Sequence, residues 1–417
     1  MSVAEDQVSA AGEVSRYRWV VMLMWMASHV WGFVILESLG FLLPSIREDM
    51  GLTPIQEGFL GAAPRIGNMI LAIPAGWLLS RFRPKPLTSV CLFLAAGLVF
   101  FQGWSPIFIV LIIGRFLYGT VSIAREPARV LLMRQWIPNK EIVVVNAMAN
   151  LLFGIVAIGF ILTPIVLRLL DNSWRNTYFV FGGVSITMAI AWQVVGRERV
   201  TSEYETEFGS QQASPLGTIL RYRELWLMGL GMLGVGINFS AISTFWPSYM
   251  LDQYGMSLTR TATLVAIGGG FSSVAGIGMG LLVRRIGRKR QVLSFAGILL
   301  AVSSVGLLWT GSYPILLLIQ IANALGWTFF PITMTIPFEL SEIKPREVAV
   351  AVSFQQSLIW LGAFIGPILA VTIHEASGDL RLALMVTSFA TVAMTAGALL
   401  LPRRWDQRTM EQQPVRT

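Results

Sequence analysis

Four ionisable side chains lie inside apolar stretches of this 417-residue chain, namely His29, Glu37, Arg65 and Arg115. An ionisable group within a stretch long enough to cross a membrane is costly to bury and usually serves a function. Such a group needs a partner of opposite charge or a ligand. The chemistry to expect is therefore ion pairing, proton binding, or recognition of an anion by a guanidinium group.

Three of these residues are expected to lie at the same depth. Counting from the polar residues or prolines at the ends of their apolar stretches, Glu37, Arg65 and Arg115 each lie roughly 10–14 Å below one surface, at about 1.5 Å per helical residue. They could form one cluster with one positive charge in excess. Glu37 could pair with either arginine, and the sequence leaves open which one.

The excess arginine is the main reason to expect an anionic ligand. A guanidinium group without a counter-charge in a low-dielectric cavity can bind a carboxylate through two parallel hydrogen bonds. The alternative for the arginine that pairs with Glu37 is a purely structural ion pair. Glu37 could also be a proton-binding site, because its charge state cannot be read from the sequence.

Four polar residues after Arg115 are expected to lie on the same helix face as Arg115. These are Tyr118, Ser122, Arg125 and Arg129, at offsets that follow the helical repeat. The stripe is expected to face a water-filled cavity, with Tyr118 near the ligand. For Arg125 and Arg129, extension of the side chain towards the membrane surface is preferred over ligand contact.

His29 lies two helical turns before Glu37, on the same helix face. It is interpreted either as a hydrogen-bonded core residue or as a participant in proton coupling, and the first interpretation is preferred. The second half of the chain offers fewer charges. There, Asn238, Asn323 and Trp327 are the expected ligand contacts, because an amide–aromatic wall suits the apolar part of an organic anion.

The composition indicates a membrane protein. Hydrophobic residues make up 54% of the chain and charged residues 13%, with a mean hydropathy of +0.66. So few charges could hardly cover the surface of a soluble protein. The net charge of +8 resides in short connections between apolar stretches and does not indicate nucleic-acid binding. With two His and one Cys, neither a metal nor a cofactor is expected.

Twelve apolar stretches are spaced as six plus six. They fall near 18–43, 57–79, 87–104, 106–124, 142–167, 176–195, 224–250, 261–283, 291–309, 314–337, 347–373 and 380–401. Each is long enough, or nearly so, to cross a hydrocarbon layer about 30 Å thick. We therefore expect an all-α membrane protein with 12 transmembrane helices in two pseudo-symmetric six-helix bundles.

The polar segments between and after these stretches suggest domain boundaries. Residues 1–196 are expected to form the first bundle and 223–404 the second. Residues 197–222 form the long polar interior segment expected to link the bundles in the cytoplasm, and 405–417 a cytoplasmic tail.

The positive residues predict the orientation. Most of the 31 Lys and Arg residues fall on the side that carries both termini, whereas Arg47, Arg168, Arg175, Arg260 and Arg381 fall on the other side. Positive residues concentrate on the cytoplasmic side of membrane proteins, so both termini are expected in the cytoplasm, across the cytoplasmic membrane. No cleaved signal peptide is expected, and the lipid bilayer is the expected surrounding.

Two basic connections about half the chain apart resemble each other. The first runs from Gly76 through Arg81 to Lys85, and the second, GLLVRRIGRKR, contains Gly280, Arg285, Gly287 and Arg288. They match most of the loop signature G-x-x-x-D-R-x-G-R-K, and the apolar stretch 106–124 adds R-x-x-x-G at Arg115 and Gly119. With the six-plus-six topology, the chain resembles the major facilitator superfamily over essentially its full length.

The resemblance implies two bundles that rock about a central site to give alternating access, and it assigns these basic connections to a cytoplasmic gate. Ser80 and Arg284 stand where the family has an acidic residue. The missing acids suggest either a weak cytoplasmic gate or one closed by other groups. The stretch 106–124 and the segment after it, with Trp136, Pro138 and Glu141, resemble the organic-anion symporter branch.

The expected function is secondary transport of a small organic anion, of carboxylate type, coupled to protons and carried out by a monomer. The alternative is a proton-driven exporter of apolar or cationic compounds, with Glu37 as the proton or cation site. A non-transporting sensor and a membrane enzyme are less favoured, because neither a large soluble extension nor a catalytic constellation is visible in the sequence.

Overall fold

The computed structural model describes residues 17–79, 82–137, 156, 159–198, 220–340, 345–402 and 405. Within these ranges every regular element is a helix. Eight described helices are long and apolar enough to cross a membrane, and the shorter apolar helices Phe108–Ala124 and Gly159–Leu169 add to them. The predicted all-α membrane fold with 12 transmembrane helices is confirmed.

The first half contains these helices: α2 (Tyr17–Glu37), α3 (Leu39–Met50), α4 (Pro54–Leu79), α5 (Pro84–Trp104), α6 (Phe108–Ala124), α7 (Glu126–Trp136), Gly159–Leu169 and α9 (Trp174–Val195). The predicted stretch 18–43 contains α2 and the first part of α3, interrupted at Ser38, whereas α6 alone fills the stretch 106–124 and α7 follows it after Arg125. Most of the predicted stretch 142–167 lies outside the described residues.

The second half contains these helices: α12 (Arg223–Tyr254), α13 (Leu258–Ile286), α14 (Lys289–Gly306), α15 (Tyr313–Gly326), α16 (Phe329–Thr335), the 3₁₀ turn η2 (Ile336–Glu339), α17 (Pro345–Ser377), α18 (Leu380–Phe389) and α19 (Val392–Leu400). The stretch 314–337 is broken after Gly326, next to Trp327. Most of the predicted linker and tail lies outside the described residues, and their boundaries stay predictions.

Left-handed glycines end several of these helices. Gly51, Gly255 and Gly287 have φ angles of +61°, +62° and +73°, and they close α3, α12 and α13 respectively. A residue with a side chain rarely adopts this conformation, so a glycine at this position stops a helix sharply. The short connections that result reverse the chain, and they keep α3 beside α4 and α12 beside α13.

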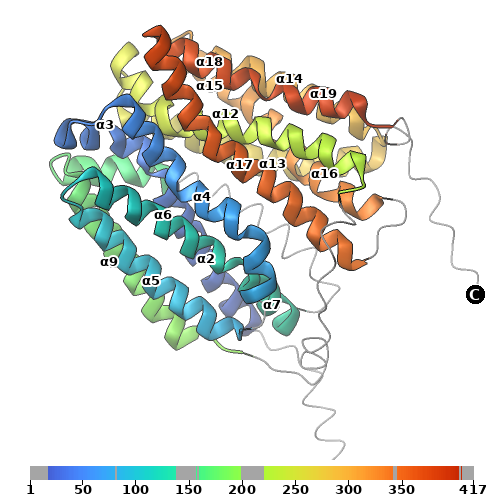
Figure 1. Ribbon diagram of the computed structural model, residues 1–417, viewed down its shortest axis with the longest axis horizontal. Coiled ribbons are helices and arrows are strands. Elements are labelled where there is room, and N and C mark those ends of the chain that lie inside the picture. Colours follow the sequence, from blue (N-terminus) through green and yellow to red (C-terminus); the bar gives the residue numbers. More distant parts are fainter. Residues whose placement is uncertain are drawn as a thin grey trace, which may run out of the picture.

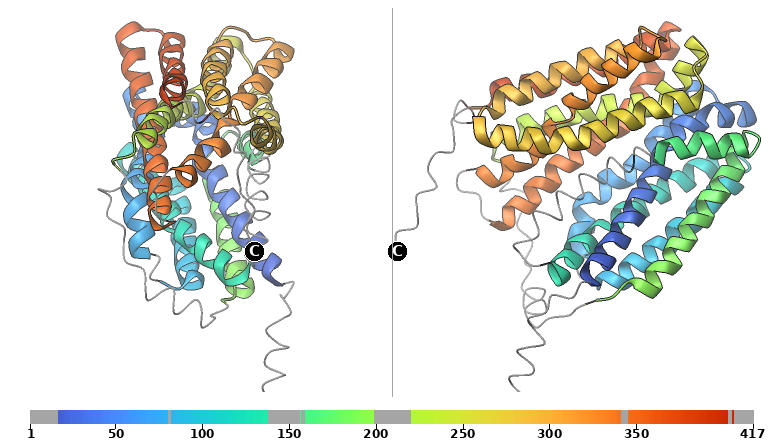
Figure 2. Two further views of the ribbon diagram at one scale, coloured as in Figure 1. Left: turned by 90° about the vertical axis from the view of Figure 1, so that its right-hand side faces the viewer. Right: turned by 180° about the vertical axis from the view of Figure 1, so that it is seen from behind.

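The two halves form two bundles inclined to each other like the arms of a V (Figure 1). The arms meet near α3, whereas α7 and α16 lie apart at the other end, as the view from behind also shows (Figure 2). The contacts between bundles join α3 and α4 to α12, and α4 to α17. We call the end of the molecule near α3 the closed end and the opposite end the open end.

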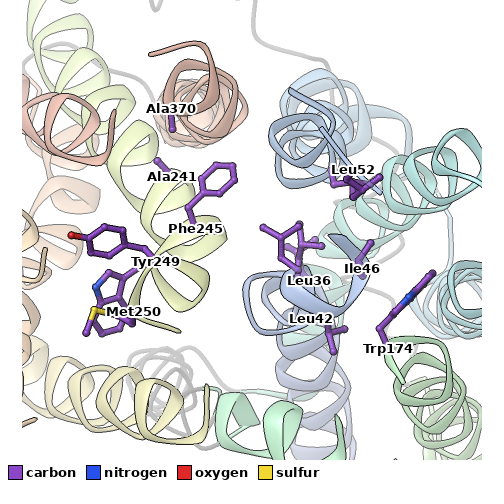
Figure 3. Packing of buried hydrophobic residues seen from close by; sticks show 14 of the residues in the cluster. Leu36, Leu42, Ile46, Leu52, Trp174, Ala241, Phe245, Tyr249, Met250 and Ala370 are labelled. Atoms are coloured by element: carbon purple, nitrogen blue, oxygen red, sulfur yellow. The ribbon is translucent and has the colours of Figure 1, made fainter. Parts of the chain in front are cut away.

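A hydrophobic cluster crosses between the bundles at the closed end. Figure 3 shows Leu36, Leu42 and Ile46 of the first bundle on one side, and Phe245 and Met250 of the second bundle on the other. All five side chains are almost completely buried. Burial of apolar surface at about 25 cal/mol per Å² favours the closed arrangement of this end.

Glycines allow the bundle backbones to approach each other in the same region. A methyl group built on Gly40 of α3 would lie 2.1 Å from the carbonyl oxygen of Ser243 in α12, and one on Gly58 of α4 would lie 2.5 Å from Val371 in α17. No real side chain tolerates such distances. The closed end therefore depends on the absence of side chains at these two positions.

Large apolar side chains cover the outer faces of both bundles. Examples with more than half of the side chain exposed include Leu169, Val194, Val302 and Leu318. A soluble protein rarely exposes apolar surface so extensively. On helices of this length, these side chains are suited to contact with lipid.

Candidate functional site

A buried ion pair joins the first two predicted helices. Arg65 of α4 donates a hydrogen bond from Nη2 to Oε1 of Glu37, the last residue of α2. Their side chains are only 3% and 4% exposed. Of the two pairings that the sequence left open, the structure has Glu37 with Arg65.

Two nitrogen atoms of Arg65 remain without a hydrogen-bond partner among the described residues after this pairing. These atoms are Nε and Nη1, and both are buried. The guanidinium carbon lies 5.8 Å from the ring centre of Phe239 and 5.5 Å from that of Trp360. These aromatic residues belong to α12 and α17 of the other bundle, so Arg65 lies at the boundary between the two bundles.

Trp327 extends this aromatic wall. Its ring packs edge-on against Phe239, with 5.5 Å between the ring centres. Phe239, Trp327 and Trp360 are each partly exposed. Of the residues predicted to contact a ligand in the second half, Trp327 is the one that the structure brings near Arg65, through Phe239.

Arg115 is engaged by neutral groups. Its Nε donates to the carbonyl oxygen of Leu60 over 2.9 Å, Nη2 to that of Leu36 over 3.2 Å, and Nη1 to the hydroxyl of Tyr178 over 3.1 Å. The side chain is buried, in line with the predicted depth. Because all three nitrogen atoms have protein partners, this geometry favours a structural role over anion recognition for Arg115.

Asn238 and Asn323 lie within the second bundle. The amide nitrogen of Asn238 donates to Ser304 over 3.1 Å, and that of Asn323 donates to Ser303 over 2.9 Å and to Ser304 over 3.1 Å. Both serines belong to α14. The amides therefore join α12 and α15 to α14, which favours interhelical packing over the predicted ligand contact.

Tyr118 and Arg125 contact α2. The hydroxyl of Tyr118 donates to the carbonyl oxygen of Gly32 over 3.0 Å. Arg125 donates from Nη1 to the hydroxyl of Ser28 over 3.2 Å and lies 5.4 Å from the ring centre of Trp25. Since Arg125 is only 6% exposed, the prediction that its side chain extends to the membrane surface is wrong: the hydroxyl and the aromatic ring hold it inside.

A cavity of about 20 Å³ beside these residues is lined by polar and apolar groups, among them Ser28, Ser122 and Ser185. That volume suffices for about one water molecule, but not for an organic anion. The cavity lies within the first bundle, between α2, α5, α6 and α9, away from the boundary between the bundles.

His29 has a partner that the sequence interpretation did not identify. Its Nδ1 lies 3.0 Å from Oε1 of Glu126, and Nε of Arg129 lies 3.4 Å from Oε2 of the same carboxylate. The His29 ring stacks on Trp25. Depth counting along the helices could have suggested this pairing, since His29 and Glu126 both lie closer to the open end than Glu37 and Arg115.

A second group of charged residues lies at the N-terminal end of α4, at the closed end of the molecule. Arg47 of α3 binds Glu57 through two hydrogen bonds of 2.5 and 3.0 Å, and it reaches Asp252 of α12 over 3.1 Å. The Asp252 contact joins the two bundles. Glu57 is buried, whereas the Asp252 side chain is 56% exposed.

Two substitutions at this closed-end group should have unequal effects. Glu57→Gln replaces the buried charged partner of Arg47 with a neutral one. It should lower the free energy of unfolding by about 1–3 kcal/mol. Asp252→Asn removes a solvent-exposed pair and should cost less than about 1 kcal/mol. Thermal unfolding in detergent measures both. A larger loss for Asp252→Asn than for Glu57→Gln would contradict this ranking.

The basic connections predicted as gate elements are partly helical. Gly280 and Arg285 lie within α13, and the turn itself consists of Gly287, with its left-handed backbone, and the exposed Arg288. In the first half, Gly76 lies within α4. Ser80 and Arg81 lie outside the described residues, so their part in a gate stays a prediction.

Within the described ranges, no three His, Cys, Asp or Glu side chains are grouped so that they could hold a metal ion. The described side chains around Arg65 offer ion pairing, hydrogen bonding and aromatic contact.

Comparison with known proteins gives a consistent result. The family model described as Major Facilitator Superfamily matches residues 21–290 and 271–414. The probable galactarate/D-glucarate transporter GudP of Bacillus subtilis is 23% identical over 94% of this chain and 94% of its own length. The probable L-galactonate transporter of Escherichia coli is 22% identical over 95% and 92%.

The probable sulfoacetate transporter SauU of Cupriavidus necator is 25% identical over 54% of this chain, which spans 55% of the length of that relative. Among solved structures, the nucleoside transporter NupG superposes with a TM-score of 0.74 at 12% identity, covering 91% of this chain and 99% of that one. An inward-facing bacterial homologue of the human lysosomal transporter Spinster superposes with a TM-score of 0.69 at 15% identity, covering 92% and 94%. Such identities support the fold alone.

Proposed function

The chain belongs to the major facilitator superfamily and is a membrane transporter of that type; we propose that it carries a small carboxylate together with a proton by alternating access. The observation that carries the proposal is Arg65, a buried guanidinium group with two unpaired nitrogen atoms at the boundary of the bundles. The relatives named for galactarate, glucarate, galactonate and sulfoacetate support an organic acid as the substrate class.

Glu37 and the substrate compete for the same arginine in this proposal. When Glu37 is ionised, it occupies Nη2 of Arg65 and the pair is neutral. Protonation of Glu37 releases one positive charge, and a substrate carboxylate then binds the guanidinium group through two hydrogen bonds. Proton and anion therefore bind together and cross as a neutral pair, which avoids the cost of a net charge in the membrane.

The aromatic residues contribute the other wall of the site. Phe239 and Trp360 come from the second bundle, so a substrate on Arg65 contacts both bundles at once. Contacts of this kind can couple substrate binding to rocking of the bundles, because the ligand binds the two states with different affinities. His29, paired with Glu126 nearer the open end, is the proposed second residue on the proton path.

In the proposed orientation, both termini lie in the cytoplasm. We propose that the protein is a monomer in the cytoplasmic membrane. The closed end then faces outward and the open end inward. The charge distribution supports this arrangement, since Arg288 lies in the connection between α13 and α14 at the open end and positive residues favour the cytoplasmic side.

Uptake into proteoliposomes tests the proposal. Vesicles with an acidic exterior and a neutral lumen should accumulate a labelled carboxylate, and a protonophore should abolish the accumulation. Galactonate, galactarate, sulfoacetate and aromatic monocarboxylates form the test panel, with an organic cation as the comparison. Proton-driven transport of the cation, without transport of any carboxylate, would contradict the proposal and indicate an exporter of cationic compounds.

A further inference from the structure

Helix α4 contains a proline immediately before the proposed substrate-binding arginine. Pro64 has no backbone N–H group, so the carbonyl oxygen of Leu60, four residues earlier, lacks its normal donor within the helix. Leu60 is completely buried. A buried carbonyl group without a donor is unfavourable, and another residue must supply the hydrogen bond.

Arg115 supplies that hydrogen bond. Its Nε donates to the Leu60 oxygen over 2.9 Å, which is the shortest of its three hydrogen bonds. Its Nη2 donates to Leu36, next to the interruption of the first helix at Ser38. A single guanidinium group therefore binds backbone oxygen atoms of α2 and α4, one directly before Glu37 and the other about one helical turn before Arg65.

Gly119, one turn after Arg115, brings α6 close enough for this contact. A methyl group built on Gly119 would lie 2.1 Å from the carbonyl oxygen and 2.6 Å from the α-carbon of Pro64. Gly67 of α4 makes a similar close approach, with 2.7 Å to the backbone nitrogen of Thr120. The two helices thus meet backbone to backbone around the proline.

We infer that Arg115 is a positioning residue that compensates for Pro64 and thereby holds Arg65 towards the boundary between the bundles, while Gly119 lets α6 approach closely enough for Arg115 to do so. The inference rests on the proposed function, because it gives Arg115 a role in carboxylate transport without substrate contact. It gives the two residues of this turn separate parts: Gly119 leaves room for the backbone of α4 at Pro64, and Arg115 reaches the carbonyl group of Leu60 that the proline leaves free.

A rescue experiment tests the inference. Arg115→Met removes the donors while keeping an unbranched apolar side chain, and it should lower the transport efficiency for the carboxylate that responds in the proteoliposome panel by about tenfold or more. Pro64→Ala restores an N–H group for the Leu60 carbonyl. The double variant Pro64→Ala/Arg115→Met should then transport at least about threefold better than Arg115→Met, with incomplete recovery because the hydrogen bonds to Leu36 and Tyr178 stay absent.

The control is Pro44→Ala, which repairs a different helix proline, inside α3, and should not rescue Arg115→Met. A double variant Pro64→Ala/Arg115→Met as inactive as Arg115→Met would overturn the inference, as would equal rescue by Pro44→Ala or full activity of Arg115→Met. Thermal unfolding without substrate separates the two proposals. Suppose that Pro64→Ala, but not Pro44→Ala, raises the unfolding temperature of Arg115→Met, and that no variant and not even the wild type transports a carboxylate. This result would retain the positioning role of Arg115 and reject the proposed function.

Discussion

Replacing Arg65 with Gln is expected to reduce carboxylate uptake by at least about 100-fold, on the scale of a lost buried charge contact of about 3 kcal/mol. The substitution removes the proposed anion receptor. It also leaves Glu37 buried without its positive partner, which should cost about 3–5 kcal/mol of unfolding free energy. Uptake in proteoliposomes and thermal unfolding in detergent measure the two effects separately.

The companion variant Glu37→Gln distinguishes the two roles of the pair. It leaves Arg65 charged, so carboxylate binding should persist while its dependence on pH is lost. The double variant Glu37→Gln/Arg65→Gln should regain stability relative to Arg65→Gln alone, because no buried charge is left without a partner, yet it should not transport. The exposed Arg260 provides the control, since Arg260→Gln should change neither property.

Two outcomes would count against this assignment. If the Arg65→Gln protein folds and transports carboxylates normally, Arg65 is not the anion receptor. A double variant that regains both stability and uptake would show that the ion pair is structural and that the carboxylate binds elsewhere.

Gly40→Ala should open the closed end of the transporter. The new methyl group would lie 2.1 Å from the carbonyl oxygen of Ser243, a backbone atom of the other bundle. No flexible side chain can give way there, so the bundles must separate. We expect the state seen here to become the minor one and transport to fall about tenfold or more, because a cycle slows when one of its states is disfavoured by about 1.4 kcal/mol or more.

Spin labels can detect this change directly. Glu48 and Gln253 are exposed residues on the two bundles at the closed end, and cysteines at both positions in a Cys91→Ala background provide one labelled pair. Gly40→Ala should lengthen the distance between the labels. Gly97→Ala is the matched control, because a methyl group there meets no atom within 4 Å. An unchanged distance distribution in Gly40→Ala would contradict the account of the closed end.

Much of the fold was predictable because the bilayer imposes a simple rule. Long apolar stretches must become helices, which predicts the six-plus-six arrangement. The depth of Glu37, Arg65 and Arg115 was also predictable, since the rise per residue of a helix is constant. The structure brings these three residues together around the end of α2, as the depth count indicated.

Side-chain direction was harder to predict. Asn238 and Asn323 lie at suitable depths, but they point towards Ser303 and Ser304 within their own bundle. A small rotation of a helix about its axis decides between cavity and core, and packing of all its neighbours sets that rotation. The sequence does contain a clue to the partner of Arg115. Pro64 leaves the carbonyl group of Leu60 without a donor in its own helix, and an arginine at the same depth can donate that hydrogen bond.

The measurement that tests the central claim most directly is the number of protons taken up when a carboxylate binds. Calorimetric titration of the purified protein in two buffers of different ionisation enthalpy gives this number, with the panel carboxylate that most raises the unfolding temperature as the ligand. The account predicts uptake of close to one proton per carboxylate for the wild type near neutral pH and of none for Glu37→Gln. Binding without proton uptake, or equal uptake in both proteins, would contradict the competition between Glu37 and substrate for Arg65.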